Sequence, residues 1–326
     1  MMNVDHLARG LGLTELGFGG AQLGNLYSAV SDEVAGETVR AAWDAGVRYF
    51  DTAPHYGLGL SERRLGRSLG TYPRDELVVS TKVGRWLEPA DTGGQPDPEG
   101  FAVPATHRRT WDFSRDGVLR SIEASLERLG LDRIDLVLIH DPDDHAREAL
   151  EEAAPALSQL RSEGVIRGYG AGMNQAPMLA RFVRETDVDV VMLAGRFTLL
   201  DQTAGEDLLP VALERGVGVI NAGIFNSGVL SRPQPRSDAS YNYGPVPADV
   251  LERTTRIAQV CEQFGVDLPT AAVAFARRHP AVVSVVVGLQ TPAHVRDLIA
   301  RWERSVPEGL WTALGDQALI TPATVS

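Results

Sequence analysis

Short runs of apolar and β-branched residues alternate with longer amphipathic helical patterns along this chain. A strand followed by a helix, many times over, is the pattern of βα units that build a parallel sheet. The pattern predicts an α/β protein, and its length of 326 residues suits an α/β barrel folded as one domain. The eight expected strands lie near residues 16–19, 47–50, 77–81, 134–139, 166–172, 188–193, 218–222 and 282–287.

Composition and charge narrow the function classes. A formal net charge of −12 argues against nucleic acid or an anionic membrane surface as the main partner. Cys261 is the lone cysteine, so no internal disulfide can form, which fits a reducing compartment. No apolar run approaches the ~18 residues of a membrane span, and the start, Met1 to His6, does not read as a signal peptide. We expect a cytoplasmic protein.

Polar side chains emerge where three of the apolar runs finish. Asp51 and Tyr56 follow the second run, Lys82 follows the third, and His140 follows the fourth. In a barrel of parallel strands the carboxyl ends meet on one face, so these four side chains are expected to lie together. Taken singly, each reads more readily as a loop tyrosine, a solvated charge or a satisfied histidine. Their joint occurrence at successive strand ends favours an active site.

The four residue types suit acid–base chemistry. A phenol with a pKa near 10 is a poor acid or base at neutral pH. An adjacent ammonium favours the phenolate, and we therefore expect Lys82 to lower the pKa of Tyr56. Asp51 would hold Lys82 and balance its charge, and His140 would hydrogen-bond the substrate oxygen.

These residues carry a family resemblance. The run from Gly46 to Ala53 (GVRYFDTA), then Tyr56, Ser61-Glu62 and Leu65-Gly66, resembles the signature of the aldo-keto reductases. Lys82 and His140 match the other two catalytic positions of that family. The resemblance covers nearly the whole chain and implies a single (β/α)8 TIM barrel over 1–326 that binds a nicotinamide cofactor without a Rossmann domain.

Within the family, residues 18–27 and 55–63 resemble the sugar-oxidising branch. That branch holds D-threo-aldose 1-dehydrogenases (L-fucose or galactose dehydrogenases) and the related pyridoxal 4-dehydrogenases. The resemblance implies oxidation of the anomeric hydroxyl of a free aldose to the lactone. The alternatives are pyridoxal oxidation, general aldehyde or ketone reduction, and a cofactor-binding regulatory subunit of a potassium channel. The expected partner is a small-molecule sugar or aldehyde, and the oligomeric state is left open.

The resemblance also implies a cofactor site. Asn174 matches the residue that binds the nicotinamide carboxamide, and the segment after the seventh strand matches the one along the pyrophosphate. Many relatives carry serine, glutamine and tyrosine where this chain has Met173, Ala194 and Ala222. The expected cofactor contacts are Gly19, Gly20, Ala21, Asp51, Asn174, Gly223, Ile224, Phe225, Asn226, Gly228, Gly288, Gln290, Thr291, His294 and Asp297.

The preferred cofactor is expected to be NAD, with NADP as the alternative. Relatives that bind NADP place a lysine or arginine after the eighth strand, against the 2′-phosphate. The matching run, 288–294, holds neither, and Asp297 follows one turn later. Arg296 is the nearest strong cation. A phosphate without a cationic partner forfeits charge-assisted hydrogen bonds worth roughly 1.5–3 kcal/mol each.

Residues 84–114 lose periodicity and are rich in proline and glycine, which predicts a long active-site loop that starts just after Lys82. Trp86 and Trp111 in this loop are candidate walls for stacking a sugar, or they pin the loop to the barrel. Asp141, Asp143 and Asp144 have the composition of a turn and helix cap, so no metal site is predicted.

Overall fold

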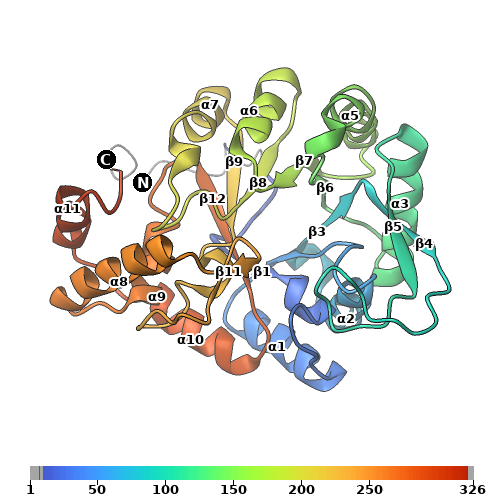
Figure 1. The fold of residues 1–326 in the computed structure, drawn as a ribbon. Helices are drawn as coiled ribbons and strands as arrows, with labels where there is room; N and C mark the ends of the chain where they lie inside the picture. Colours follow the sequence, from blue (N-terminus) through green and yellow to red (C-terminus); the bar gives the residue numbers. More distant parts are fainter. Residues whose placement is uncertain (1–6, 8–9, 322–326) are drawn as a thin grey trace.

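A computed structural model describes Leu7 and residues 10–321; the start from Met1 to His6 lies outside the described residues. Eight parallel strands form a closed barrel in the order β1-β12-β9-β8-β7-β6-β3-β2, and helices surround it (Figure 1). The predicted TIM barrel is therefore confirmed. The barrel strands are β1 (Leu16–Gly19), β2 (Tyr49–Asp51), β3 (Val78–Val83), β6 (Leu136–His140), β7 (Gly168–Met173), β8 (Val190–Ala194), β9 (Gly218–Ala222) and β12 (Val282–Gly288).

The helices begin where the sequence offers caps. Ser31 accepts a hydrogen bond from the backbone of Val34 at the start of α1, and Asp267 caps α9 with Pro269 in its first turn. The helices are α1 (Asp32–Asp44), α2 (Leu60–Leu69), α3 (Arg115–Leu129), α4 (Ala146–Glu148), α5 (Ala154–Ser162), α6 (Ala176–Glu185), α7 (Leu208–Arg215), α8 (Ala248–Gln263), α9 (Leu268–Phe275), α10 (Pro292–Trp302) and α11 (Glu308–Asp316). A π-helical stretch, η5 (Ala149–Ala153), joins α4 to α5, and the short 3₁₀ turns are η2 (Gly20–Gly24), η3 (Arg74–Glu76), η4 (Asp143–His145), η6 (Thr203–Gly205) and η7 (Asn226–Gly228).

Apolar side chains fill the barrel and the layer between strands and helices. Inside the barrel, Tyr49, Leu136 and Ile220 are fully buried, and Leu7 and Leu11 from the N-terminal segment join the same cluster. The interior is therefore a packed core, as is usual for this architecture. A second and larger cluster packs the strands against the helices.

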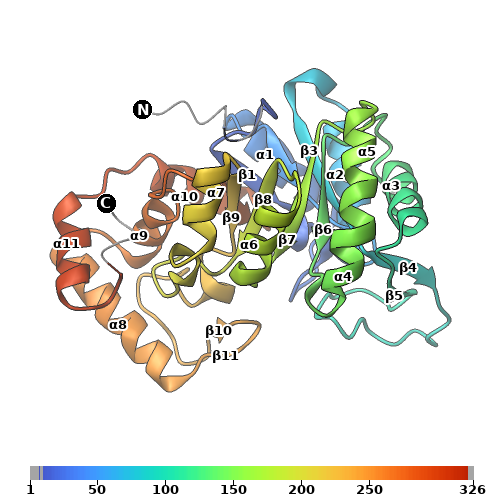
Figure 2. The same ribbon diagram turned by 90° about the horizontal axis from the view of Figure 1, so that it is seen from above.

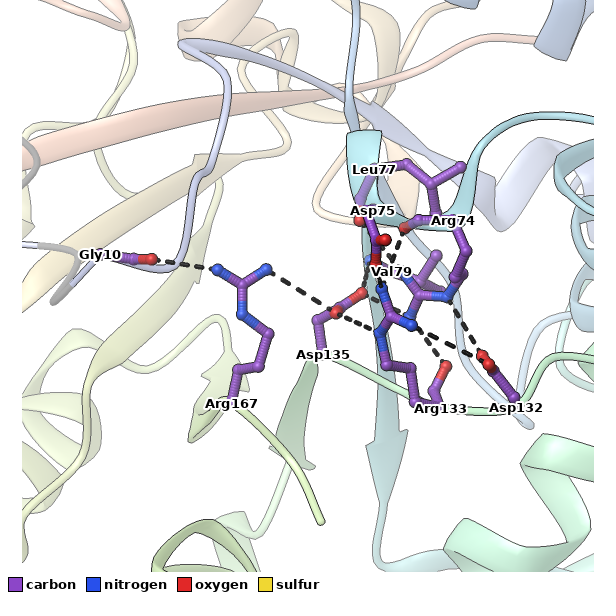
Figure 3. Close-up of polar contacts among 9 residues, drawn as sticks. All are labelled: Gly10, Arg74, Asp75, Leu77, Val79, Asp132, Arg133, Asp135 and Arg167. Atoms are coloured by element: carbon purple, nitrogen blue, oxygen red, sulfur yellow. Dashed lines mark hydrogen bonds and ion pairs between the residues drawn. The ribbon is translucent and has the colours of Figure 1, made fainter. Parts of the chain in front are cut away.

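An ionic network ties the chain together at the amino-terminal ends of the strands (Figure 3). The fully buried Asp135 accepts hydrogen bonds from Arg74, at 2.7 Å, and from the backbone of Val79, at 2.8 Å. Arg167 lies 3.8 Å from Asp135 and donates to the carbonyl of Gly10. A buried carboxylate needs such partners, and here they join β3, β6 and the N-terminal segment.

Two antiparallel hairpins project from the opposite, carboxyl-end face, below the barrel strands in Figure 2. They are β4–β5 (Arg85–Pro89 and His107–Trp111) and β10–β11 (Ser240–Tyr241 and Gly244–Pro245). The first lies within the predicted loop 84–114. In Leu7 and residues 10–321 together, no helix is both long and apolar enough to cross a bilayer.

Candidate active site

Asp51, Lys82 and His140 occupy the last or next-to-last positions of β2, β3 and β6. The Lys82 ammonium donates to Asp51 Oδ2 at 2.6 Å and to the carbonyl of Thr52 at 2.9 Å. Ser80, two residues earlier on the same face of β3, donates to Asp51 Oδ1 at 2.7 Å. The two charges are thus paired and almost fully buried.

The opposite face of β3 fixes the strand against the helix layer. Thr81 donates to Glu62 of α2 at 2.7 Å, and Arg128 of α3 donates to the other oxygen of Glu62 at 2.5 Å. Glu62 is fully buried, so its charge is compensated inside the protein. This contact holds the neighbouring Lys82 in register.

Tyr56 lies in the loop after β2, where the backbone is tightly packed. Gly57 has φ +62°, and a Cβ there would lie 2.2 Å from the carbonyl oxygen of Gly24. Only glycine fits such an approach at this φ. The Tyr56 ring meets the His140 ring edge-on, with centroids 5.9 Å apart, and the Lys82 ammonium lies 4.7 Å from the Tyr56 ring centroid. The four predicted residues are therefore brought together.

The pKa of Tyr56 differs from the expectation. Burial raises the pKa of Tyr56 to about 12, although Lys82 acts to lower it. The expected effect of the ammonium is present, but loss of hydration of the phenolate outweighs it. Burial also lowers the pKa of Lys82, yet Asp51 and Tyr56 together raise it to about 12, so Lys82 stays charged.

Two imidazoles beside Tyr56 are held neutral. Burial, followed by the nearby charges of Arg85 and Lys82, lowers the pKa of His140 well below its usual value. Burial and the cations Arg85 and Arg109 lower the pKa of His55 to about 2. The two rings pack edge-on, with centroids 5.6 Å apart. A neutral His140 can donate one hydrogen bond to a substrate oxygen and accept one at its other nitrogen.

Residues 84–114 close over this cluster. Phe101 is buried, and its ring lies 5.2 Å from that of His55 and 6.1 Å from that of Tyr56, centroid to centroid. Arg109 donates to the carbonyl of His55 at 2.9 Å and pairs with the buried Asp97 at 2.7 Å. The segment predicted as an active-site loop thus forms a wall of the site, held by buried side chains that its proline-rich sequence did not reveal.

The two candidate stacking residues occupy different environments. Trp86 lies under Arg120 of α3, with the guanidinium 4.5 Å from its centroid. Trp111 lies opposite Arg85 in the hairpin register, and the Arg85 guanidinium lies 4.6 Å from the centroid of the Trp111 ring. Trp111 is 44% exposed. Trp86 therefore fastens the hairpin to α3, and Trp111 lies on the side of Arg85 and His55.

The expected cofactor residues gather in three groups, of which the first surrounds the end of β1. Gly19 lies in register with Asp51 on one side and Gly288 on the other. The buried Gln22 Oε1 has no hydrogen-bond partner in the described part of the chain, and a Cβ at Gly288 would lie 2.2 Å from it. Bare backbone and an unsatisfied buried oxygen fit a polar ligand laid along this edge.

The second group lies after β7, β8 and β9. Asn174 donates to the carbonyl of Ala194 at 2.9 Å, and Asn226 donates to Gly195 and accepts from Thr198. Ile224 is buried in the core. The side chains of Ile224 and Asn226 are thus engaged within the protein, and the backbone N–H of Gly228 donates to the carbonyl of Phe225. The backbone N–H groups of Gly223 and Phe225 are left for a phosphate ligand.

The third group opens α10. Gln290 donates to Ser28 at 2.7 Å, Thr291 caps the helix by accepting from the backbone of His294, and Asp297 pairs with Arg301. Pro292 has no N–H and Thr291 accepts from that of His294, so the N–H of Ala293 remains at the start of this eleven-residue helix for an anionic group. Together the three groups fit a dinucleotide lying from Asn174 to α10.

Several site residues were missed from the sequence. His55, Arg85 and Asp141 each stand next to or near a predicted catalytic residue, and Phe101 and Arg109 lie in the loop. Adjacency to Tyr56, Lys82 and His140 at strand ends was the available signal for the first three. The contact of Arg85 with Asp141 joins segments far apart in the sequence and is visible only in the fold.

A parallel eight-stranded barrel with a tyrosine, a paired lysine and aspartate and a histidine at its strand ends defines a class of barrel oxidoreductases. The model of the aldo/keto reductase family matches residues 15–314, and the chain belongs to that family. It is 47% identical over 317 residues to a D-threo-aldose 1-dehydrogenase from a Pseudomonas species, and 38% identical over 330 residues to the pyridoxal 4-dehydrogenase of Microbacterium luteolum. Each alignment covers 96% of both chains.

The fold is likewise similar to solved structures. The glycerol dehydrogenase of Gluconobacter oxydans superimposes with a TM-score of 0.73 over 95% of this chain and 94% of its own, at 23% identity. That similarity bears on the fold alone. The protein is thus an oxidoreductase of the aldo/keto reductase family that uses a nicotinamide cofactor.

Proposed function

We propose that the protein oxidises the anomeric hydroxyl of a free aldose to the lactone, with NAD as its preferred cofactor. The observation that carries the proposal is the Lys82–Asp51 pair, which holds an ammonium 4.7 Å from the Tyr56 ring centroid beside a neutral His140. Support for the substrate class comes from the relative that is 47% identical, a D-threo-aldose 1-dehydrogenase.

Each residue has a separate task. His140 donates a hydrogen bond to the anomeric oxygen and orients it. Tyr56, as phenolate, takes the hydroxyl proton while the C1–H bond breaks and C1–O becomes a carbonyl. Lys82 stabilises the phenolate, and Asp51 fixes Lys82. A bound nicotinamide cofactor supplies the hydride acceptor at Asn174.

The preference for NAD rests on the start of α10. No lysine or arginine occurs in 288–294, and Gln290 and Thr291 offer polar groups suited to free ribose hydroxyls. Asp297 is paired with Arg301, which weakens the repulsion between the Asp297 carboxylate and a 2′-phosphate. Arg296, which is exposed on α10, is the nearest strong cation. It would favour NADP if its guanidinium reached the 2′-phosphate.

A second candidate, general reduction of aldehydes or ketones, draws support from the pKa of Tyr56. A phenol with a pKa of about 12 is protonated at neutral pH and is ready to act as an acid. A third candidate, oxidation of pyridoxal, draws support from the relative that is 38% identical, a pyridoxal 4-dehydrogenase.

One screen tests the three candidates. L-fucose, D-arabinose, L-galactose and pyridoxal are each assayed with NAD and NADP by the absorbance of the reduced nicotinamide. The reverse reaction is followed with pyridoxal and a simple aldehyde. Oxidation of aldoses with NAD supports the proposal, and activity on pyridoxal or simple aldehydes alone overturns it. Tyr56→Phe serves as the inactive control.

A further inference from the structure

Arg85, at the start of β4, reaches back into the active site. Its guanidinium bonds the carboxylate of Asp141 and lies 3.4 Å from His55 Nδ1. Asp141 Oδ2 in turn lies 3.5 Å from His140 Nε2. The side chains of Arg85 and Asp141 are only 15% and 25% exposed. An ion pair therefore stands directly beside the imidazole that faces Tyr56, outside the four catalytic positions.

We propose that Arg85 and Asp141 form the subsite that binds the hydroxyl next to the reacting carbon of the sugar. This subsite rests on the proposed aldose oxidation. A guanidinium donates and a carboxylate accepts, so together they satisfy both hydrogen-bonding roles of one hydroxyl. His140 Nε2 and Asp141 Oδ2 lie 3.5 Å apart, so two adjacent hydroxyls of one sugar can reach them together. When His140 binds the anomeric oxygen, the adjacent C2 hydroxyl meets the pair.

Three destabilising features of these residues also favour a polar ligand at this position. Asp141 has φ +44°, a left-handed conformation that is strained for most residues and recurs at functional sites. Burial raises the pKa of Asp141, although Arg85 opposes this rise. Arg85 Nε and His140 Nδ1 are buried without a hydrogen-bond partner in the described part of the chain. A site for simple aldehydes needs none of these polar groups, whereas a polyol supplies partners for them.

The test compares sugars that differ by one hydroxyl. D-arabinose is paired with 2-deoxy-D-ribose, which is D-arabinose without its C2 hydroxyl, and L-fucose is paired with 2-deoxy-L-fucose. The measured quantity is the ratio of kcat/KM within each pair. A hydrogen bond to a charged group is worth roughly 1.5–3 kcal/mol, so the wild-type ratio should be on the order of 10–100-fold.

Asp141→Asn is the first variant, because asparagine tolerates the left-handed backbone and keeps the shape of the side chain. Arg85→Lys is the second, since it keeps the charge and loses the planar fork. Both should bring the ratio toward one mainly by slowing the full sugar. The matched control is Arg120→Gln on α3. Like Arg85, Arg120 lies over a tryptophan of the hairpin, but that residue is Trp86, on the face of the hairpin away from His55. The ratio of kcat/KM should therefore stay at its wild-type value.

Each outcome is decisive. If both sugars of a pair slow equally in Asp141→Asn and Arg85→Lys, the pair is only structural and the subsite is overturned. If one variant fails to fold, the other variant and the wild-type ratio still test the subsite. A wild-type ratio near one overturns the subsite but leaves aldose oxidation standing. A wild type that oxidises no aldose overturns the proposed function and the subsite with it.

Discussion

Replacing Lys82 by methionine removes the cation that favours the phenolate of Tyr56. The ammonium lies 4.7 Å from the Tyr56 ring centroid. At an effective dielectric constant near 20, two unit charges at this separation interact by about 3.5 kcal/mol, which is about 2–3 pKa units. Because burial already holds the pKa of Tyr56 at about 12, Lys82→Met should raise that pKa further. Oxidation below the pKa should then slow by on the order of 10²–10³-fold.

The assay is the pH dependence of kcat/KM in both directions. Oxidation needs the phenolate, so its rate should rise with pH, and in Lys82→Met that rise should move to higher pH. A variant enzyme leaves the equilibrium constant of the reaction unchanged, so reduction at the same pH should slow by a similar factor. Cofactor affinity, measured by fluorescence quenching, should change little. An unshifted profile with near-normal kcat/KM would refute the role of Lys82.

Folding needs its own control, because Lys82→Met leaves Asp51 buried without its cation. Breaking a buried pair on one side typically costs about 3–5 kcal/mol of stability. The double variant Lys82→Met/Asp51→Asn removes both charges, and Oδ1 at position 51 can still accept the bond from Ser80. The double variant should fold more stably than Lys82→Met and show a smaller pKa shift, because Asp51 itself raises the pKa of Tyr56.

Three further outcomes are expected. Tyr56→Phe should lose on the order of 10²–10⁴-fold in kcat, since it removes the proton-transferring group, with cofactor affinity unchanged; near-normal turnover would contradict the assignment. Steady-state kinetics should give at least a tenfold higher kcat/KM with NAD than with NADP, whereas equal efficiency would show that Arg296 or another cation reaches the 2′-phosphate. Acid should destabilise the fold: the pKa of His55 is lowered to about 2, so below about pH 6.5 the unfolded chain binds a proton that the folded chain does not. Urea titrations should show a loss of up to about 1.4 kcal/mol per pH unit from this residue, and His55→Gln should flatten the loss.

The barrel and its strand ends were predictable because both follow from local pattern. Apolar runs gave the strands, and Ser31 and Pro269 marked helix starts through capping chemistry that acts within one turn. The positions of Asp51, Lys82 and His140 followed from the rule that parallel strands present their carboxyl ends on one face. Boundaries shifted by one or two residues, as with β2, which spans Tyr49–Asp51 rather than 47–50.

The internal structure of the long segment after β3 could not be predicted from the sequence, because contacts with distant residues determine it. Its hairpin pairs Arg85 with Trp111 across an intervening stretch rich in proline and glycine. The backbone of Tyr27 bonds the carbonyl of Gly100, which anchors the middle of the segment to the loop after β1. The pKa of Tyr56 was also misjudged. Residue types indicated the neighbouring cation, but the extent of burial that outweighs it depends on Phe101 and the closed hairpin.

Proton transfer and the proposed selectivity for sugars therefore depend on different residues of the chain. The proton-transfer residues sit on or just after β2, β3 and β6, where buried pairs such as Lys82–Asp51 tolerate little change. The groups proposed to read the sugar, Arg85 and Asp141, lie at the start of a hairpin and in the turn after β6, just beyond the barrel strands, and their side chains pair with each other. Substitution of Arg85 can therefore alter which hydroxyl pattern is accepted while the Lys82–Asp51 pair stays in place. If selectivity between sugars instead followed substitutions in β2 or β3, this separation would be wrong.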